Sequence, residues 1–274
     1  MGVFTHWRLP ALMVVAPLSA QAQTATAPAE APTEPVRRIE PSKIILVGDS
    51  TTAVMGGWGP SFCAYHVTSF MACVNLARGG RSSGNYRTEG SWEVALAEMR
   101  TKGYRDIWVV IQFGHNDQPG KPGRSTDLVT EFPANLARYV DEARAAGAKP
   151  ILATPLSRRM FSEAKLQNDL EPWAAAVRRV AVDKQVPLID LNADSAAALQ
   201  AMGEARADRF AQLPKSSAPV EPVASTEVQD LPMAQRKLSF DRTHLGTEGA
   251  DYFAAMVTRE LAAAVPHMRP LLLP

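Results

Sequence analysis

The chain has 274 residues, of which 46% are hydrophobic, so it can bury the core of one domain and still carry tails. Its 29 Lys and Arg residues and 28 Asp and Glu residues leave a net charge of +1, and no basic run could neutralise a row of phosphates. These features argue against a nucleic-acid partner and favour a neutral or weakly charged substrate.

The first residues have the pattern of a secretory signal peptide, which we place at residues 1–22. A short basic N-terminal region ends at Arg8, an apolar stretch runs from Leu9 to Ala20, and Ala20-Gln21-Ala22 is a small-x-small cleavage site. The apolar stretch is too short to span a bilayer. We therefore expect export to the periplasm or the extracellular space, with no stable membrane anchor. Residues 23–41 are rich in Ala, Pro, Thr and Glu, which predicts a flexible linker.

Apolar runs alternate with helical stretches along residues 42–265. Five runs indicate buried strands, at 43–48, 73–77, 107–112, 150–154 and 186–190. One helix can be predicted in detail: Thr130 can cap it, Gly147 can end it, and one apolar face is formed by Phe132, Leu136, Val140 and Ala143. This alternation predicts a flavodoxin-like three-layer α/β/α sandwich with a five-stranded parallel sheet, followed by a C-terminal tail at 266–274.

Two further features leave alternatives open. An oxidising compartment would permit a bridge between the only cysteines, Cys63 and Cys73, which could instead be two small buried apolar residues. Residues 214–237 contain four prolines and no periodicity, so they predict a long loop that is either a wall of the substrate cleft or disordered. The chain has no Cys-x-x-Cys motif and no His cluster, so we expect no metal and no cofactor.

Four short blocks could together supply the groups of a serine hydrolase. Acyl transfer by a serine needs a hydroxyl, an imidazole to take its proton, a carboxylate to orient the imidazole, and donors for the oxyanion. Three blocks follow the first three predicted strands, and the fourth comes near the C-terminus: Gly48-Asp49-Ser50, Gly79-Gly80-Arg81-Ser82, Gly114-His115-Asn116-Asp117 and Asp241-x-x-His244. Parallel sheets bind ligands at the carboxyl ends of their strands, where Ser50, Gly80 and Asn116 should therefore meet.

The residue types in these blocks suit that chemistry. One turn between Asp241 and His244 can bring the carboxylate to Nδ1 and leave Nε2 facing Ser50, although a capped turn with a surface His is also possible. We expect Ser50 to lie where the strand ends and a helix begins, with its N–H in the site and the helix dipole favouring negative charge. Gly80 allows a backbone N–H to approach a ligand closely, although Gly-Gly pairs also form ordinary loops.

The third block also has a simpler interpretation. Asn116 carries an amide donor that stays neutral at every working pH, but an Asn-Asp pair after a strand is common in turns. We interpret His115, Asp49 and Asp117 as residues that hold loops through local hydrogen bonds, and not as groups that act on substrate.

The order of the blocks and their residue types resemble those of the SGNH hydrolases, also called the GDSL family, and within that family those of the rhamnogalacturonan acetylesterase group. The similarity spans about residues 43–260 and rests on Gly48-Asp49-Ser50-Thr51-Thr52-Ala53, Gly57-Trp58-Gly59, Asn75-x-Ala77-x-Gly79-Gly80-Arg81-Ser82-Ser83, Phe113-Gly114-His115-Asn116-Asp117, Thr154-Pro155 with Arg158-Arg159-x-Phe161, and Asp241-x-x-His244-Leu245. The resemblance implies that Ser50 is the nucleophile, His244 the base and Asp241 its orienting residue. It also implies an oxyanion hole formed by the Ser50 N–H, the Gly80 N–H and the Asn116 amide.

The sequence thus predicts an exported serine esterase that removes acetyl groups from an acetylated polysaccharide or oligosaccharide of the pectin or rhamnogalacturonan type. Trp58, Arg81, Glu89 and Trp92 are the expected substrate contacts, because they suggest a polar surface with aromatic rings for stacking. A lipid esterase or thioesterase on the same fold would need an extended apolar groove. A carbohydrate-binding module without turnover is the alternative outside enzymes, and the intact Ser, Asp and His set argues against it.

Overall fold

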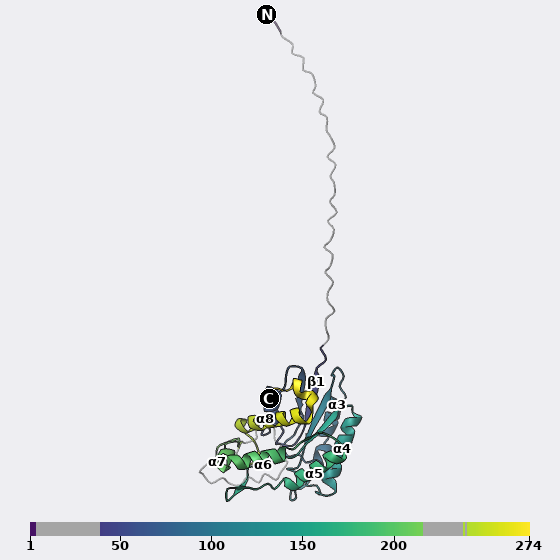
Figure 1. The fold of residues 1–274 in the computed structure, drawn as a ribbon. Coiled ribbons are helices and arrows are strands. Elements are labelled where there is room, and N and C mark those ends of the chain that lie inside the picture. Colours follow the sequence, from purple (N-terminus) through teal and green to yellow (C-terminus); the bar gives the residue numbers. More distant parts are fainter. Residues whose placement is uncertain (4–38, 216–237, 239) are drawn as a thin grey trace. The chain divides into compact units, whose positions relative to one another are not determined.

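In the part of the chain that the structure describes, five parallel strands form the central sheet, in the order β2-β1-β3-β4-β7. Figure 1 shows strands of this sheet with helices around them. Their bounds are β1 Ser42–Gly48, β2 Met71–Asn75, β3 Ile107–Gln112, β4 Lys149–Ala153 and β7 Leu188–Ile189. Each overlaps one predicted strand, so the predicted sheet is confirmed. The chain leaves β1 for β2 on one side and then crosses to β3 on the other, which puts the point where the strand order reverses between β1 and β3.

The computed structural model describes residues 1–3, 39–215, 238 and 240–274. The predicted signal peptide from residue 4, the linker as far as residue 38 and the segment 216–237 lie outside the described residues. The helices are α1 Gly59–Tyr65, α2 Asn85–Thr88, α3 Ser91–Met99, α4 Glu131–Ala145, α5 Glu171–Asp183, α6 Leu191–Met202, α7 Glu204–Asp208 and α8 Thr247–Ala264. A short hairpin that the sequence did not predict pairs β5 Phe161–Ser162 with β6 Lys165–Leu166.

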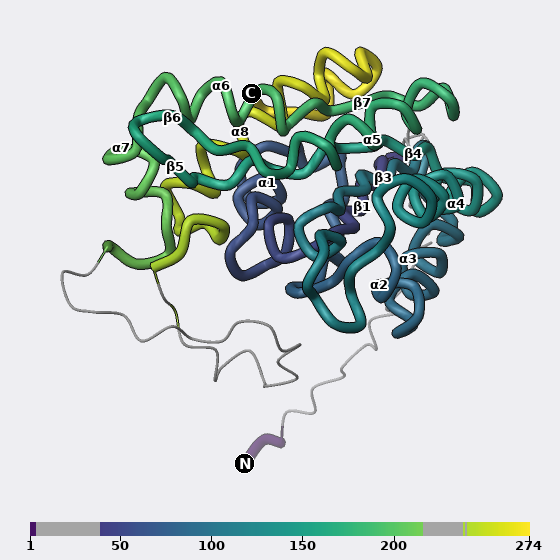
Figure 2. The backbone as a smooth tube through the Cα atoms, turned by 90° about the horizontal axis from the view of Figure 1, so that it is seen from below, coloured from purple at the N-terminus to yellow at the C-terminus, as the bar shows by residue number. Residues whose placement is uncertain are grey.

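Side chains alternate between the two faces of the sheet because successive residues of a strand point to opposite sides. Ile44 and Leu46 of β1 join a core cluster with residues of α1, α6 and α8. Ile45 and Val47 join a second cluster with residues of α3, α4 and α5. Figure 2 shows these two groups of helices on opposite sides of the strands, which is the predicted three-layer sandwich.

Helix α4 confirms the predicted apolar face but not the predicted cap. Phe132, Leu136, Val140 and Ala143 are all buried, and Gly147 follows the helix with a φ of 86°. Thr130 occupies the N-cap position, yet its hydroxyl donates to Asp127 Oδ1 at 2.7 Å and accepts nothing from the helix. Because this carboxylate also accepts the backbone N–H of Thr130 at 2.7 Å, Asp127 holds the start of the helix.

The C-terminal residues correct one prediction, and the two cysteines resolve an alternative that the sequence left open. The expected tail is a 3-10 helix, η2, at Pro266–Leu271, and it packs into the core through Met268, Leu271 and Leu272. Three apolar residues within five positions, Met268, Leu271 and Leu272, were too short a pattern to predict this packing. Cys63 of α1 and Cys73 of β2 form a disulfide with their Cα atoms 5.4 Å apart, so they are not two free buried thiols.

Candidate active site

The loop after β1 carries Ser50 in a turn that is tied to β3. Asp49 Oδ1 accepts the backbone N–H and the hydroxyl of Thr51, both at 2.8 Å. Gln112 at the end of β3 donates to the same hydroxyl at 2.7 Å. Helix α1 begins only at Gly59, so the expected helix start at Ser50 is wrong and no helix dipole acts there. The turn that holds the serine is therefore fixed by buried local bonds to Asp49 and by a buried long-range bond from Gln112.

His244 and Asp241 complete a chain of hydrogen bonds to Ser50. His244 Nε2 lies 2.9 Å from Ser50 Oγ, although the two residues are 194 positions apart. His244 Nδ1 lies 3.0 Å from Asp241 Oδ2. A proton on Nδ1 is the arrangement that lets Nε2 accept the serine proton. The structure therefore brings the three residues together in the order that nucleophilic catalysis requires.

The environment of Asp241 keeps this carboxyl ionised. Its Oδ1 accepts the backbone N–H groups of Thr243 at 2.7 Å and His244 at 2.6 Å, while Oδ2 faces the imidazole. Burial acts to raise the pKa of Asp241, but the hydrogen bond and charge of His244 and the two N–H groups outweigh it and lower the pKa to about 2. A permanent negative charge at this position orients the ring and stabilises an imidazolium when one forms.

Three donors of the expected oxyanion hole lie on adjacent loops. The Arg78 N–H bonds the Gly48 carbonyl at 3.0 Å, so Gly80 follows directly beside the loop of Ser50. Asn116 Nδ2 donates to the Arg81 carbonyl at 3.0 Å, which joins the loop after β3 to the loop after β2. An amide nitrogen carries two N–H groups, so this bond leaves one of them for another acceptor.

Ser50 and Gly80, the two expected backbone donors of the oxyanion hole, lie in turns and not in the strands. Within the described residues, neither the Ser50 N–H nor the Gly80 N–H donates a hydrogen bond to protein. Gly80 has a φ of 78°, where L side chains are strained, while a Cβ there would meet only Arg124 Nη1, at 3.7 Å. A left-handed backbone, and not crowding by protein atoms, is thus the reason for glycine at position 80.

Asp117 holds the loop after β2, which carries Gly80, through hydrogen bonds from Ser83. Its Oδ1 accepts the Ser83 N–H at 3.0 Å, the Ser83 hydroxyl at 2.6 Å and the Thr126 hydroxyl at 3.0 Å. Burial raises the pKa of Asp117 to about 7 against these hydrogen bonds, which favour the ionised form. Asp117 therefore acts on the loop, as the sequence suggested.

The second His–Asp contact near the nucleophile is internal. His115 Nδ1 lies 3.3 Å from Asp49 Oδ2, and both side chains are buried. Burial lowers the pKa of His115, against the attraction of Asp49. Burial would raise the pKa of Asp49, but the attraction of His115 and the two hydrogen bonds from Thr51 lower it. Because it is His244 whose Nε2 lies within hydrogen-bond distance of Ser50 Oγ, we interpret His115 as a structural neighbour of the loop that carries Ser50.

Two of the four expected substrate contacts are corrected by the structure. Trp58 and Trp92 are both 0% exposed, so neither ring offers a face to a sugar. The Trp58 indole donates to Gln112 Oε1 at 2.9 Å, and the Trp92 indole donates to Glu142 Oε2 at 2.5 Å. Arg81 and Glu89 lie nearer the surface and are paired with each other, with Arg81 Nε 2.9 Å from Glu89 Oε2.

Gln112 and Asn75 are residues whose roles the sequence did not predict. Gln112 links the Trp58 indole to the Thr51 hydroxyl, and that hydroxyl donates to Asp49. Asn75 Nδ2 donates to the Thr52 carbonyl at 2.9 Å, which fastens the same loop to the end of β2. A polar residue at the end of an apolar strand run was the available signal for both.

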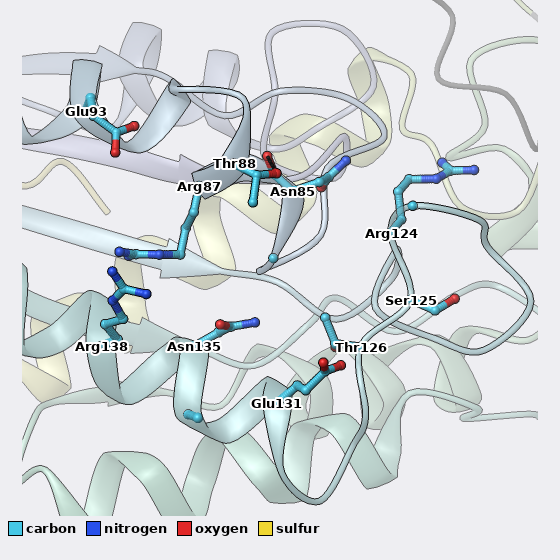
Figure 3. A pocket seen from close by; sticks show the side chains of 13 residues that line it. Asn85, Arg87, Thr88, Glu93, Arg124, Ser125, Thr126, Glu131, Asn135 and Arg138 are labelled. Atoms are coloured by element: carbon cyan, nitrogen blue, oxygen red, sulfur yellow. Dashed lines mark hydrogen bonds between the residues drawn. The ribbon is translucent and has the colours of Figure 1, made fainter.

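A polar cavity of about 620 Å³ lies beside the loop after β2, between α2 and the start of α4 (Figure 3). Its walls carry amide, hydroxyl, guanidinium and carboxylate groups, including those of Asn85, Thr88, Glu93, Asn135 and Arg138. Among the described helices, none is long and apolar enough to cross a membrane. The described residues also contain no group of three or more His, Cys, Asp or Glu side chains suited to a metal ion.

Comparison with known proteins identifies the family. Residues 46–251 match the model of the GDSL-like lipase/acylhydrolase family. The probable rhamnogalacturonan acetylesterase YesY of Bacillus subtilis is 34% identical over 168 residues, which cover 59% of this chain and 75% of that protein. The rhamnogalacturonan acetylesterase RhgT of the same organism is 34% identical over 179 residues, which cover 62% of this chain and 74% of that protein.

Solved structures show the same fold at lower identity. Protein YxiM of Bacillus subtilis matches with a TM-score of 0.62 and 23% identity over 82% of this chain and 57% of that chain. Axe2, an acetylxylan esterase of Geobacillus stearothermophilus, matches with a TM-score of 0.54 and 19% identity over 82% of this chain and 96% of that chain. The chain belongs to the GDSL-like lipase/acylhydrolase family, the SGNH hydrolases, whose members act on ester bonds.

Proposed function

We propose that this SGNH hydrolase is an exported serine esterase that removes acetyl groups from a polysaccharide of the rhamnogalacturonan or pectin type. The hydrogen-bond chain from Ser50 through His244 to Asp241 carries the proposal of a serine mechanism. The names of the two relatives at 34% identity support acetylated carbohydrate as the substrate class.

The reaction follows from the geometry of the site. Ser50 Oγ attacks the acetyl carbonyl while His244 Nε2 takes the hydroxyl proton. The N–H groups of Ser50 and Gly80 and the free N–H of Asn116 stabilise the oxyanion. His244 then gives this proton to the departing sugar oxygen, which leaves as a hydroxyl. A water molecule activated by the same imidazole attacks the acetyl-serine ester, which releases acetate and returns a proton to Ser50 Oγ.

The polar cavity supports a carbohydrate substrate over a long-chain lipid. Sites for acyl chains are lined mainly by apolar side chains, whereas this cavity is lined by amides, hydroxyls and charged groups. It lies directly behind the loop that carries Gly80, because Asn85 Oδ1 accepts the Ser82 N–H at 2.6 Å and Asn135 donates to the Ser83 hydroxyl at 3.1 Å. A sugar chain bound there would pass close to the oxyanion donors.

Acetate release from a panel of substrates tests the proposal. We expect release from acetylated rhamnogalacturonan, weaker release from acetylated xylan, and a preference for acetyl over octanoyl among p-nitrophenyl esters. Ser50→Ala is the control for contaminating esterase. A preference for long acyl chains would contradict the carbohydrate assignment and favour the lipid esterase.

Export has a separate test. The full-length chain, produced in a Gram-negative host, should accumulate outside the cytoplasm with Gln23 as its first residue, since the apolar start ends in a small-x-small site. Recovery of an uncleaved chain from the cytoplasm would contradict this part of the proposal.

A further inference from the structure

The segment that carries His244 has little regular structure of its own. Residues 240–246 belong to no helix or strand. Inside the turn, the N–H groups of Thr243 and His244 both bond to Asp241 Oδ1. The positions of the imidazole and the carboxylate therefore depend on how the backbone of 241–244 is held from outside.

One residue, Arg159, contacts all four carbonyls of that turn. Its backbone N–H donates to the Arg242 carbonyl at 2.8 Å. Its guanidinium donates through Nη2 to the carbonyls of Asp241 at 2.9 Å and His244 at 2.7 Å, and through Nη1 to the Thr243 carbonyl at 3.4 Å. Arg159 lies in the loop after β4, so it reaches the turn from the same edge of the sheet that carries Ser50.

A packing role alone does not explain an arginine at this position. The side chain is 0% exposed, and a buried charge is costly unless it is hydrogen-bonded and compensated. Apolar residues of similar volume often replace buried ions without loss of stability. Burial lowers the pKa of Arg159 to about 10, against the attraction of Asp241 and Asp208, so the group stays charged at neutral pH. Its planar fork of five N–H groups suits several carbonyls at once, which an ammonium group does not match.

We propose that Arg159 is a positioning residue that holds the 241–244 turn so that His244 Nε2 stays within hydrogen-bond reach of Ser50 Oγ. The inference rests on the proposed roles of Ser50 and His244. Gly56 leaves room for the same side chain, since a Cβ at that position would lie 3.1 Å from His244 Cβ and 3.2 Å from the ring atom Cδ2. Without the guanidinium the carbonyls of Asp241, Thr243 and His244 lose their shared donor, and the imidazole can move relative to the serine.

The test compares Arg159→Met with Arg144→Met. Arg144 is a matched control because its guanidinium also donates to backbone carbonyls, those of Lys184 and Gln185, at 2.7 and 3.1 Å, and these follow α5 at the other edge of the sheet. For each variant we measure melting temperature, kcat and KM on p-nitrophenyl acetate, and the rate of Ser50 labelling by a fluorophosphonate. Labelling reports activation of the serine without any sugar substrate.

Arg159→Met should lower kcat and the labelling rate together by about 10- to 100-fold, as expected for a small misplacement of a catalytic group. KM should stay within about twofold of the wild type, because Arg159 does not touch substrate. Arg159→Lys keeps the charge and part of the hydrogen bonding, so its kcat should lie between those of Arg159→Met and the wild type. A kcat for folded Arg159→Met equal to that of Arg144→Met would overturn the inference.

The remaining outcomes are also decisive. If Arg159→Met does not fold, Arg159→Lys decides, and full kcat in that variant would overturn the inference. If neither folds, Arg159 is a requirement of the fold and the positioning role is refuted. A wild-type protein that labels but releases no acetate from polysaccharides would refute the proposed substrate and leave the role of Arg159 standing. A wild-type protein inert to esters and phosphonate would refute the serine mechanism and this inference together.

Discussion

Replacing Asn116 by Ala separates stabilisation of the oxyanion from stabilisation of the fold. Asn116 Nδ2 donates one N–H to the Arg81 carbonyl, and in the proposed mechanism its other N–H donates to the reacting oxygen. The charge on that oxygen exists only in the transition state, so loss of the donor should lower kcat by about 10²- to 10³-fold with little change in KM.

The same substitution has a stability cost that can be worked out in advance. It leaves the Arg81 carbonyl without its donor in a largely buried environment, which costs about 1 to 3 kcal/mol. For a domain of this size, about 2 to 4 °C of melting temperature is lost per kcal/mol, so we expect a decrease of roughly 2 to 12 °C. This is far too small to explain the kinetic loss at 25 °C if the protein melts well above that temperature.

Asn135→Ala is the matched control for the loop. Asn135 Nδ2 donates to the Ser83 hydroxyl at 3.1 Å, so its loss loosens the same loop without removing an oxyanion donor. We expect a comparable decrease in melting temperature and a change in kcat of less than about tenfold. If Asn116→Ala is destabilised but keeps the rate of the wild type per folded molecule, Asn116 is a turn residue and the reasoning is refuted.

Four further predictions concern Ser50, Asp241 and the disulfide. Ser50→Ala should lower kcat by at least about 10³-fold with unchanged melting temperature, and more than a tenth of the wild-type rate would contradict its role as nucleophile. Asp241→Asn should lower kcat by about 10²- to 10⁴-fold because the imidazole loses its orienting charge, and an unchanged rate would mean that another group orients the ring. The pKa of Asp241 is lowered from 3.8 to about 2, so its ionised form stabilises the fold above pH 3.8 and this contribution is lost as the pH falls toward 2. The wild type should therefore lose more melting temperature than Asp241→Asn between pH 3.8 and pH 2. Replacing Cys63 and Cys73 by Ser should cost about 2 to 3 kcal/mol of stability and leave kcat unchanged at 25 °C, and equal unfolding midpoints in urea with and without the bridge would contradict this.

The sheet was predictable because parallel strands covered on both faces appear as continuous apolar runs. β1 and β3 match the runs from which they were predicted to within one residue. The order of the blocks then placed Ser50, Gly80 and Asn116 at one edge, since each follows a strand end. Here the local sequence is sufficient, because burial of a strand depends on its own side chains.

The start of α1 could not be predicted in the same way. Ser50 was expected at a helix N-terminus, yet residues 51–58 intervene before the helix begins at Gly59. That turn is stabilised by Asn75 and Gln112, which lie 23 and 61 positions away from the residues they bond. Hydrogen bonds from other strands compete with local helix formation, and a pattern confined to residues 48–60 does not contain them.

Trp58 and Trp92 show why aromatic residues near a motif are weak evidence for stacking on substrate. An indole has a large apolar surface and one N–H, so it suits a sugar-binding face and a core position equally well if the N–H finds an acceptor. Both acceptors here, Gln112 and Glu142, are at least 50 positions away in sequence. Glu142 would be an unexpected partner on sequence grounds, because it lies on α4 with the exposed charges of that helix. The position of each ring therefore depends on a polar partner that only the folded chain supplies. The proposed role of Arg159 depends in the same way on its four acceptors, which lie more than 80 residues further along the chain.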